Sequence, residues 1–277
     1  MVALLYNSLK SREIAFAMAT TEALNPSQFA FLTNLTADRS SSPNPQEEMD
    51  KVIILVNAEA QASGQMSRLS PVTEKMVIAL KNAVPKSLAV EVTGTASLWS
   101  KMESGKTSQN NLIWCPLTIQ LPNWVNFPGK KVYQACRDIE ERRAWVAHTL
   151  HYKTSQGDSS FGDLWLPITV TSKGLEYGEV IGEGMIPNAY SQPISLERES
   201  LKSLHRLAAQ LLDNLQAPAS VYLLQFRLAH REVVFDRLWP FPAAPAIASL
   251  RGQQTDLYAA YWNCLRRQAM VDHSLAI

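Results

Sequence analysis

The sequence predicts an α+β protein with a mixed or mainly antiparallel sheet and helices packed on one face. In the second half of the chain, strand-like runs come in pairs that are joined by short turns, as in β-hairpins. Stretches with helical apolar periodicity separate these pairs. The chain has 277 residues, of which 46% are hydrophobic, so it can bury a substantial core.

Composition argues against several classes of protein. The charged fraction is 18% and the formal net charge is +1, so we expect neither a nucleic-acid partner nor a membrane partner. The three cysteines are too far apart in the sequence for a CxxC pair, which disfavours a disulfide framework and a structural zinc site. No apolar run approaches the ~20 residues that span a bilayer, and the apolar start is too short for a signal peptide. We therefore expect a cytoplasmic location.

Residues 1–110 are expected to form an amino-terminal α/β region. Residues 3–34 are rich in alanine and leucine and look helical, whereas the serine, proline and charge of residues 36–50 predict a mobile loop. Further on, the pattern predicts a buried strand from Lys51 to Asn57, a short helix from Pro71 to Ala83, and a strand from Ser87 to Thr93.

Residues 111–277 are expected to form the second domain. Strands are predicted at Leu112 to Leu121, where Pro116 favours an edge or a bulge, and at Lys131 to Ala135. Two hairpins are predicted, from Leu164 to Thr171 with Glu176 to Gly182, and from Ser220 to Leu228 with Arg231 to Leu238. Helices are predicted at Asp138 to Leu150, with Asp138 as N-cap, at Ser195 to Gln216, and at Thr255 to Gln268.

Two sets of basic residues are candidate anion-binding groups. Gly129, Lys130 and Lys131 follow a turn, and a glycine beside lysines can hold a phosphate through free backbone N–H groups and an ammonium charge. An ordinary hairpin turn is the alternative, because the segment matches no Walker pattern. The second set is Arg227, Arg231 and Arg237, on or near the last hairpin, where Arg227 and Arg237 share one face in one of the two registers. These arginines could bind an anion or an acidic partner, or only keep a sheet edge soluble.

Two further features have weaker signals. The segment Trp239-Pro240-Phe241-Pro242 is stiff, so its aromatic side chains either cap the core or bind a partner at low entropic cost. His148 and His151 share a helix face, but no HExxH pattern supplies a third metal ligand.

Three segments occur in the order of a known family. They are Asn126 to Val132, with its Pro-Gly-Lys-Lys run, Val221 to Phe226, and Val234 to Pro242. This order over residues 124–265 resembles the ATP-grasp superfamily, most like its carboxyaminoimidazole ribonucleotide synthetase branch. The first segment is similar to the family's glycine-rich loop over the nucleotide phosphates. The second and third lie where the family has a strand with a metal-binding glutamate, and an Asn-Glu pair before a Pro-Arg-Pro segment.

The departures from the family pattern concern the metal site. Gln225 stands at the glutamate position, Asp236 at the asparagine, Arg237 at the second acidic position, and Phe241 at the arginine between the prolines. Carboxylates hold the Mg²⁺ that bridges the phosphates in such a site, so an amide and a guanidinium in their place disfavour the metal. The resemblance therefore implies a degenerate site. Its implied ligand-binding set is Gly129, Lys130, Lys131, Gln225, Asp236 and Arg237, its partner-binding set is Trp239 and Phe241, and no catalytic residue or metal ligand is assigned.

Three functions follow from this pattern. The first is a binding, regulatory or assembly protein without ligase activity, which takes a protein partner, a nucleotide or another anion. The second is an active carboxylate ligase that uses ATP and Mg²⁺, with Lys130 on the phosphates and Asp236 plus Glu179 or Glu183 on the metal. The third is a scaffolding factor that has no nucleotide site. Nucleotide binding separates the first two from the third, and turnover separates the second from the first.

Overall fold

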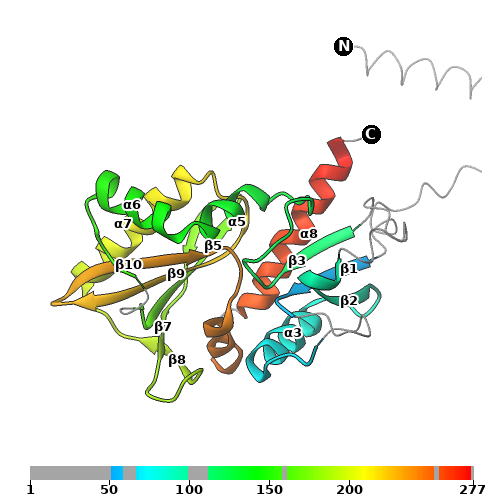
Figure 1. Ribbon diagram of the computed structural model, residues 1–277, viewed down its shortest axis with the longest axis horizontal. Helices are drawn as coiled ribbons and strands as arrows, with labels where there is room; N and C mark the ends of the chain where they lie inside the picture. The colour runs from blue at the N-terminus through cyan, green and yellow to red at the C-terminus, as the bar shows by residue number, and fades with distance from the viewer. Residues whose placement is uncertain (1–50, 59–66, 99–111, 158–160, 253–255, 276–277) are drawn as a thin grey trace, which may run out of the picture. The chain divides into compact units, whose positions relative to one another are not determined.

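The computed structural model describes residues 51–58, 67–98, 112–157, 161–252 and 256–275, without the side chains of 269–275. These residues belong to one compact unit, Met49–Ile277, and their strands form two sheets (Figure 1). The helix expected at 3–34 and the loop expected at 36–50 lie outside the described residues.

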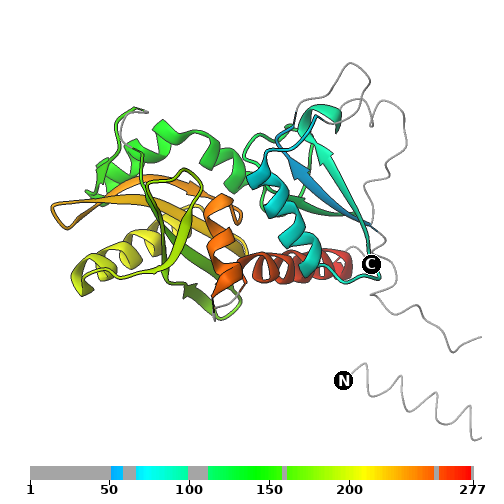
Figure 2. The ribbon, with the colours of Figure 1, turned by 90° about the horizontal axis from the view of Figure 1, so that it is seen from below.

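The smaller sheet has three parallel strands. It has the order β2-β1-β3, where β1 is Lys51–Val56, β2 is Ala89–Gly94 and β3 is Leu112–Pro116. The helix α3, Pro71–Ala83, connects β1 to β2 as predicted, and the side chain of Ser70 caps it. Figure 2 shows α3 and α8, Leu257–Leu275, side by side next to this sheet. The strand that the sequence predicts at Leu112 to Leu121 ends at Pro116, and its pairing with β1 places it in this smaller sheet rather than with the other strands of the expected second domain.

The larger sheet has seven strands and is almost entirely antiparallel. Its path is β4-β10-β9-β5-β7-β8, with β6 also paired to β5, and only the short β4–β10 pair is parallel. The strands are β4 (Lys153–Thr154), β5 (Leu164–Thr171), β6 (Gly174–Tyr177), β7 (Val180–Glu183), β8 (Tyr190–Ile194), β9 (Ser220–Ala229) and β10 (Glu232–Trp239). The β9–β10 hairpin is confirmed, and its turn lies at His230-Arg231, where both residues have positive φ.

The first predicted hairpin is confirmed with one correction. The run from Glu176 to Gly182 forms two strands, because the strand conformation is interrupted at Gly178, between β6 and β7. Both strands pair with β5, and Pro167 of β5 lies at the break, where it offers a carbonyl to Gly178 but no N–H.

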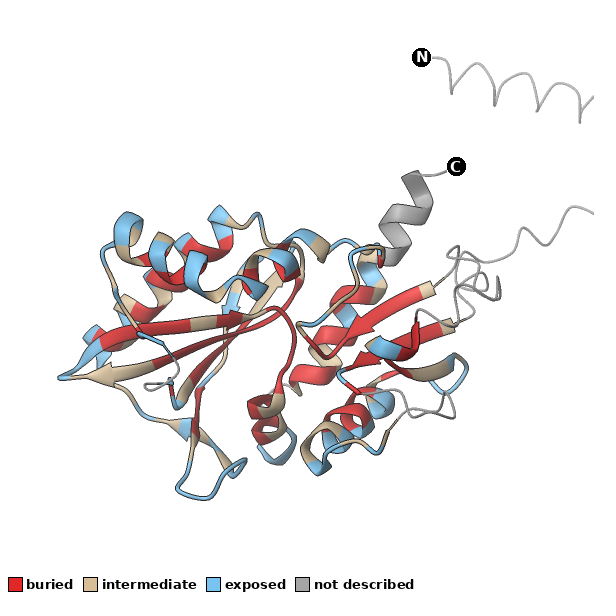
Figure 3. Cartoon of the chain, in the orientation of Figure 1, coloured by how far each residue is buried: buried red, intermediate tan, exposed pale blue. Residues whose placement is uncertain are grey.

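Three helices cover one face of the larger sheet. They are α5 (Lys130–Arg137), α6 (Ile139–Leu150) and α7 (Arg198–Asn214), and α6 and α7 lie beside β10 and β9 in Figure 1. Their apolar sides and the facing strand residues share one core, and Figure 3 shows that the buried positions follow β9 and β10. This arrangement confirms the α+β class. The opposite face packs against α8 and the 3₁₀ segment η3, Ala244–Arg251, in a second core that includes the smaller sheet.

Two of the expected elements differ in the structure. The predicted strand from Lys131 to Ala135 is the helix α5, because Val132, Tyr133 and Cys136 bury on one helical face. The helix α7 begins at Arg198 rather than at Ser195, and no side-chain hydrogen bond caps it at Glu197.

Other expectations about helices hold. Asp138 is the N-cap of α6 and accepts a hydrogen bond from the Glu141 N–H at 3.0 Å. The apolar side of α7, within the helix predicted at Ser195 to Gln216, is buried at Leu204, Ala208, Leu211 and Leu212. Within the described ranges, no helix is both long enough and apolar enough to cross a membrane.

Candidate functional site

A β-bulge in β10 positions Asp236. Phe235 pairs with Phe226 and Arg237 pairs with Gln225, so Asp236 is an extra residue that has no partner of its own on β9. The side chain of Asp236 is fully buried at the edge of the α6-covered face. A buried carboxylate is stable only when it is paired and hydrogen-bonded, so its contacts define the site.

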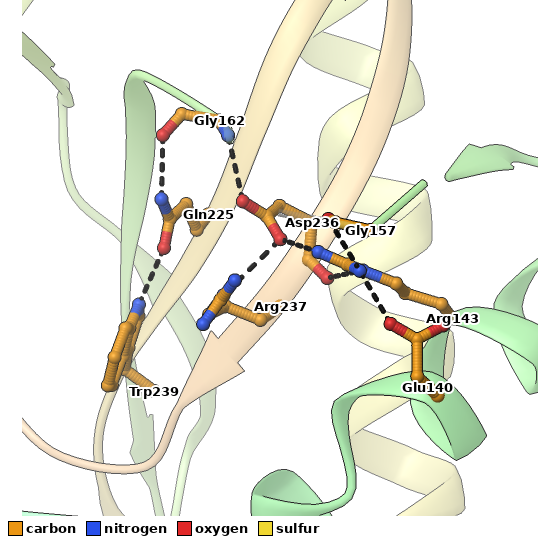
Figure 4. A network of polar contacts seen from close by, with 8 residues as sticks. All are labelled: Glu140, Arg143, Gly157, Gly162, Gln225, Asp236, Arg237 and Trp239. Carbon is orange, nitrogen blue, oxygen red and sulfur yellow. Dashed lines mark hydrogen bonds and ion pairs between the residues drawn. The ribbon is translucent and has the colours of Figure 1, made fainter. Parts of the chain in front are cut away.

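Both carboxylate oxygens of Asp236 have donors (Figure 4). Its Oδ1 accepts from Arg143 Nη2 at 2.5 Å and from Arg237 Nε at 3.3 Å, and its Oδ2 accepts from the backbone N–H of Gly162 at 2.8 Å. Arg143 reaches Asp236 from α6, whereas Arg237 lies on the other side, beside Trp239. The carboxylate thus joins α6, β10 and the segment before β5.

The Arg143 side chain is almost completely buried and uses every nitrogen. Its Nε donates to the Asp236 carbonyl oxygen at 3.1 Å, and its Nη1 donates to the Glu140 carboxylate at 2.8 Å and to the Gly157 carbonyl at 3.2 Å. Glu140 is mostly exposed, so water and salt screen its charge more than that of Asp236.

Gln225 extends the network with neutral groups. Its Nε2 donates to the Gly162 carbonyl at 2.6 Å, and its Oε1 accepts from Trp239 Nε1 at 2.8 Å. This position therefore needs one donor and one acceptor, which an amide supplies and a carboxylate does not. Gly162 lies against the β9 backbone so closely that a Cβ would be 2.5 Å from the Phe226 carbonyl oxygen.

Arg237 differs from Arg143 because it is only partly satisfied. Its guanidinium carbon lies 5.1 Å from the ring centre of Phe161 and 5.8 Å from that of Trp239, and Nε contacts Asp236. Its Nη2 is buried without a hydrogen-bond partner. The Arg237 side chain is 15% exposed and Phe161 is 51% exposed, so this guanidinium lies close to the surface.

The charges at the site favour anions over cations. Two guanidinium groups, Arg143 and Arg237, contact the single buried carboxylate of Asp236. A metal ion bound to Asp236 would either displace the two guanidinium groups or be repelled by their positive charge. Elsewhere in the part of the chain that the structure describes, no three His, Cys, Asp or Glu residues are grouped as a metal site.

The structure brings some of the predicted residues together and separates others. Gln225, Asp236, Arg237 and Trp239 form one network, whereas Gly129, Lys130 and Lys131 form the start of α5. Lys130 lines a small depression with Phe127, Gln134 and Arg137, and no described hydrogen bond links it to the network.

Phe241 is a correction to the predicted partner-binding pair. It is 3% exposed and stacks on Tyr133 with ring centres 5.9 Å apart, so it caps the core. Trp239 is half-buried and is held by its bond to Gln225. Cys115 and Cys136 are buried core residues, and burial raises the pKa of the Cys136 thiol to about 12.

Sequence reasoning missed Arg143, Glu140 and Gly162. Arg143 lies within the helix predicted at Asp138 to Leu150, and a charged residue in a helix is a weak signal for a buried partner. Gly162 directly precedes Asp163 and the strand β5, a place where glycine is also common in ordinary loops. Neither signal identifies Asp236, which is 93 positions from Arg143 in the sequence.

Neither a protein-family model nor a curated protein sequence matches the chain. Solved structures do match its fold. Glycinamide-RNase-transformylase T from Mycobacterium tuberculosis has a TM-score of 0.55 at 14% identity, over 78% of this chain and 79% of that one. N5-carboxyaminoimidazole ribonucleotide synthetase from Thermus thermophilus has a TM-score of 0.55 at 9% identity, over 77% of each chain.

A putative ATP-grasp superfamily protein from Archaeoglobus fulgidus has a TM-score of 0.50 at 9% identity, over 77% of this chain and 88% of that one. At these identities the likeness concerns the fold alone. It agrees with the order of segments over residues 124–265. The chain therefore has an ATP-grasp-like fold.

Proposed function

We propose that this chain is a binding protein on an ATP-grasp-like scaffold and that it has no ligase activity. The observation that carries the proposal is the occupied carboxylate of Asp236. At the positions where the resemblance expects metal ligands, Asp236 is the one acidic side chain, and Arg143, Arg237 and Gly162 take both of its oxygens. The Asp236 carboxylate is thus already paired with two arginine side chains of the protein.

Metal binding at Asp236 would be costly in this arrangement. Mg²⁺ requires oxygen ligands at about 2.0–2.1 Å in octahedral geometry, so it would have to displace Arg143 from the carboxylate. Arg143 would then be a buried cation that has lost its buried partner and keeps only the exposed Glu140. Removing one partner of a buried pair costs about 3–5 kcal/mol. Gln225 adds only a neutral amide oxygen, and Trp239 already donates to it.

The ligase alternative depends on Glu179 or Glu183 as substitute ligands. Glu183 accepts a hydrogen bond from the Asn188 N–H at 2.6 Å within its own β7–β8 hairpin, and Glu179 is exposed. In the described network, neither carboxylate contacts Asp236. These contacts favour the binding protein over the ligase. A protein partner at Trp239 and a cytoplasmic location are further parts of the proposal.

The test is nucleotide hydrolysis by the intact protein with ATP and Mg²⁺. We expect a rate at the buffer background for the wild type, for Asp236→Asn and for Glu183→Gln. A clear wild-type rate that either substitution abolishes would replace this proposal with the ligase.

Thermal unfolding with and without ATP separates binding from scaffolding alone. A ligand at 100 times its dissociation constant stabilises the folded state by about 2.7 kcal/mol, which is readily seen as a higher melting temperature. No shift with nucleotide or with other anions would favour the scaffolding factor.

A further inference from the structure

We infer that Arg227 and Arg237 form a metal-independent site for an oxyanion, the carboxylate or phosphate of a small ligand. The site lies on the β9–β10 face opposite α7. This inference rests on the proposed binding function, since it names the chemical class of ligand that the protein takes.

Strand register places the two arginines on the same face. Arg237 pairs directly with Gln225, and Arg227 follows Gln225 by two residues on β9, so all three side chains leave the sheet on one side. That side is the one from which Leu223 packs against α8, whereas Phe226 packs toward α7. Diagonal neighbours on adjacent strands are about 7–8 Å apart at Cα, which lets two long side chains reach one ligand.

The contacts of Arg237 leave one of its nitrogens without an acceptor. A guanidinium donates hydrogen bonds only in its own plane. Phe161 and Trp239 lie within cation–π distance of this group, and Nε is directed to Asp236. Nη2 is buried and has no acceptor among the described residues, so an oxyanion bound beside it would complete its hydrogen bonds. A guanidinium fork matches the two oxygens of a carboxylate or phosphate.

Arg227 is the second donor. Its Nε is also buried without a hydrogen-bond partner, and Arg227 makes no ion pair within the described residues. By comparison, Arg143 is paired with Asp236. Arg231 is also paired, with its Nε 3.2 Å from a carboxylate oxygen of Glu197. A buried N–H that lacks an acceptor is destabilising, so an anion that bonds both arginines would remove an existing cost.

The charge balance points in the same direction. Arg143, Arg227 and Arg237 carry three positive charges, whereas Asp236 carries the one fully buried negative charge of the network. Glu140 offsets part of the difference, but its side chain is 76% exposed. Arg227 adds a positive charge that no ion pair within the described residues offsets, whereas Arg143 and Arg237 share the carboxylate of Asp236.

The experiment is calorimetric titration of the full chain with inorganic phosphate and, separately, with citrate, in EDTA at low ionic strength. We expect one of the two probes to bind without metal, and which of them binds identifies phosphate or carboxylate as the ligand group. Arg237→Lys and Arg227→Gln should each weaken binding at least tenfold, because lysine lacks the planar fork and glutamine lacks the charge. Arg231→Gln, an exposed arginine of the same hairpin, should change affinity less than twofold.

A readout on the wild type guards against misfolded variants. Arginine Nε–H resonances of Arg227 and Arg237 should shift during the titration, while that of Arg231 should not. Absence of binding by both probes, or binding that both substitutions leave unchanged, would overturn the inference.

The same samples separate this inference from the proposed function. Hydrolysis of ATP with Mg²⁺ that Asp236→Asn abolishes would remove the proposed function. No hydrolysis, a melting temperature that ATP raises, and no binding of phosphate or citrate would together remove only the oxyanion site.

Discussion

The guanidinium of Arg143 on α6 lies 2.5 Å from the carboxylate of Asp236 on β10, and both side chains are almost completely buried. The pair ties a helix to a strand that comes 93 positions later in the sequence. Gly162 and Arg237 also donate hydrogen bonds to this carboxylate, so the pair helps to position the loop before β5 and the side chain of Arg237.

The buried pair predicts strong coupling between its two residues. Asp236→Asn and Arg143→Met should each lower the free energy of unfolding by about 3–5 kcal/mol, because each removes the closest ion-pair partner of a buried charge. The double variant should lose clearly less than the sum of the two. Urea denaturation of the four proteins measures the coupling energy.

An exposed pair is the matched control. Lys202 and Glu199 on α7 are 2.9 Å apart but largely exposed, so Glu199→Gln should change stability by no more than about 1 kcal/mol. Additive losses in the buried cycle would contradict the coupling.

Gln225→Glu tests whether the network requires an amide. The substitution places a carboxylate oxygen against the Gly162 carbonyl, where Nε2 now donates at 2.6 Å. We expect a loss of about 1–3 kcal/mol at neutral pH. The loss should shrink at acidic pH, because the protonated acid can donate to that carbonyl again. Gln134→Glu on the exposed side of α5 is the control, and equal stability of the two variants would count against the amide requirement.

Gly162→Ala tests the close approach of the loop to β9. Its Cβ would lie 2.5 Å from the Phe226 carbonyl oxygen and 2.8 Å from the Phe226 nitrogen. Backbone atoms cannot move aside cheaply, so we expect a loss of at least about 1–3 kcal/mol. At Gly184 the nearest atom is 3.5 Å away, so Gly184→Ala should stay within about 0.5 kcal/mol of wild type. Urea midpoints decide this comparison, and a neutral Gly162→Ala would contradict the described geometry.

The lowered pKa of His205 leads us to expect a loss of stability at acidic pH. Burial lowers the pKa of His205, which stacks on Tyr177 at 4.0 Å between ring centres. The unfolded chain, with a pKa of about 6.5, therefore binds a proton before the folded chain does. Stability is full above that pH and falls as pH drops toward the folded pKa.

His205→Gln removes this titrating group, so its stability difference between about pH 7.5 and about pH 5 should be smaller than that of wild type. Urea denaturation at the two pH values is the measurement. An equal or larger pH dependence in the variant would show that other groups cause the loss.

Local pattern accounts for most of the elements. The helix at Pro71–Ala83, the Asp138 cap and the β9–β10 hairpin are predictable because periodicity, capping and turn residues lie within a few positions of each other. The strand expected at Lys131 to Ala135 is wrong because local pattern alone does not distinguish a strand from a helix there. Its few residues fit a strand equally well, and only the burial of Val132 and Cys136 under the larger sheet selects the helix.

The sequence by itself determined the α+β class, the order of segments that resembles the ATP-grasp superfamily, and the residue types Gln225, Asp236 and Arg237. Only the tertiary structure decided what these residues do. A bulge in β10 directs the Asp236 side chain toward Arg143, and the register of β9 places Arg227 on the same face of the sheet as Arg237. Ion pairs between distant segments depend on distances of a few ångströms, and such distances arise from packing rather than from local sequence pattern.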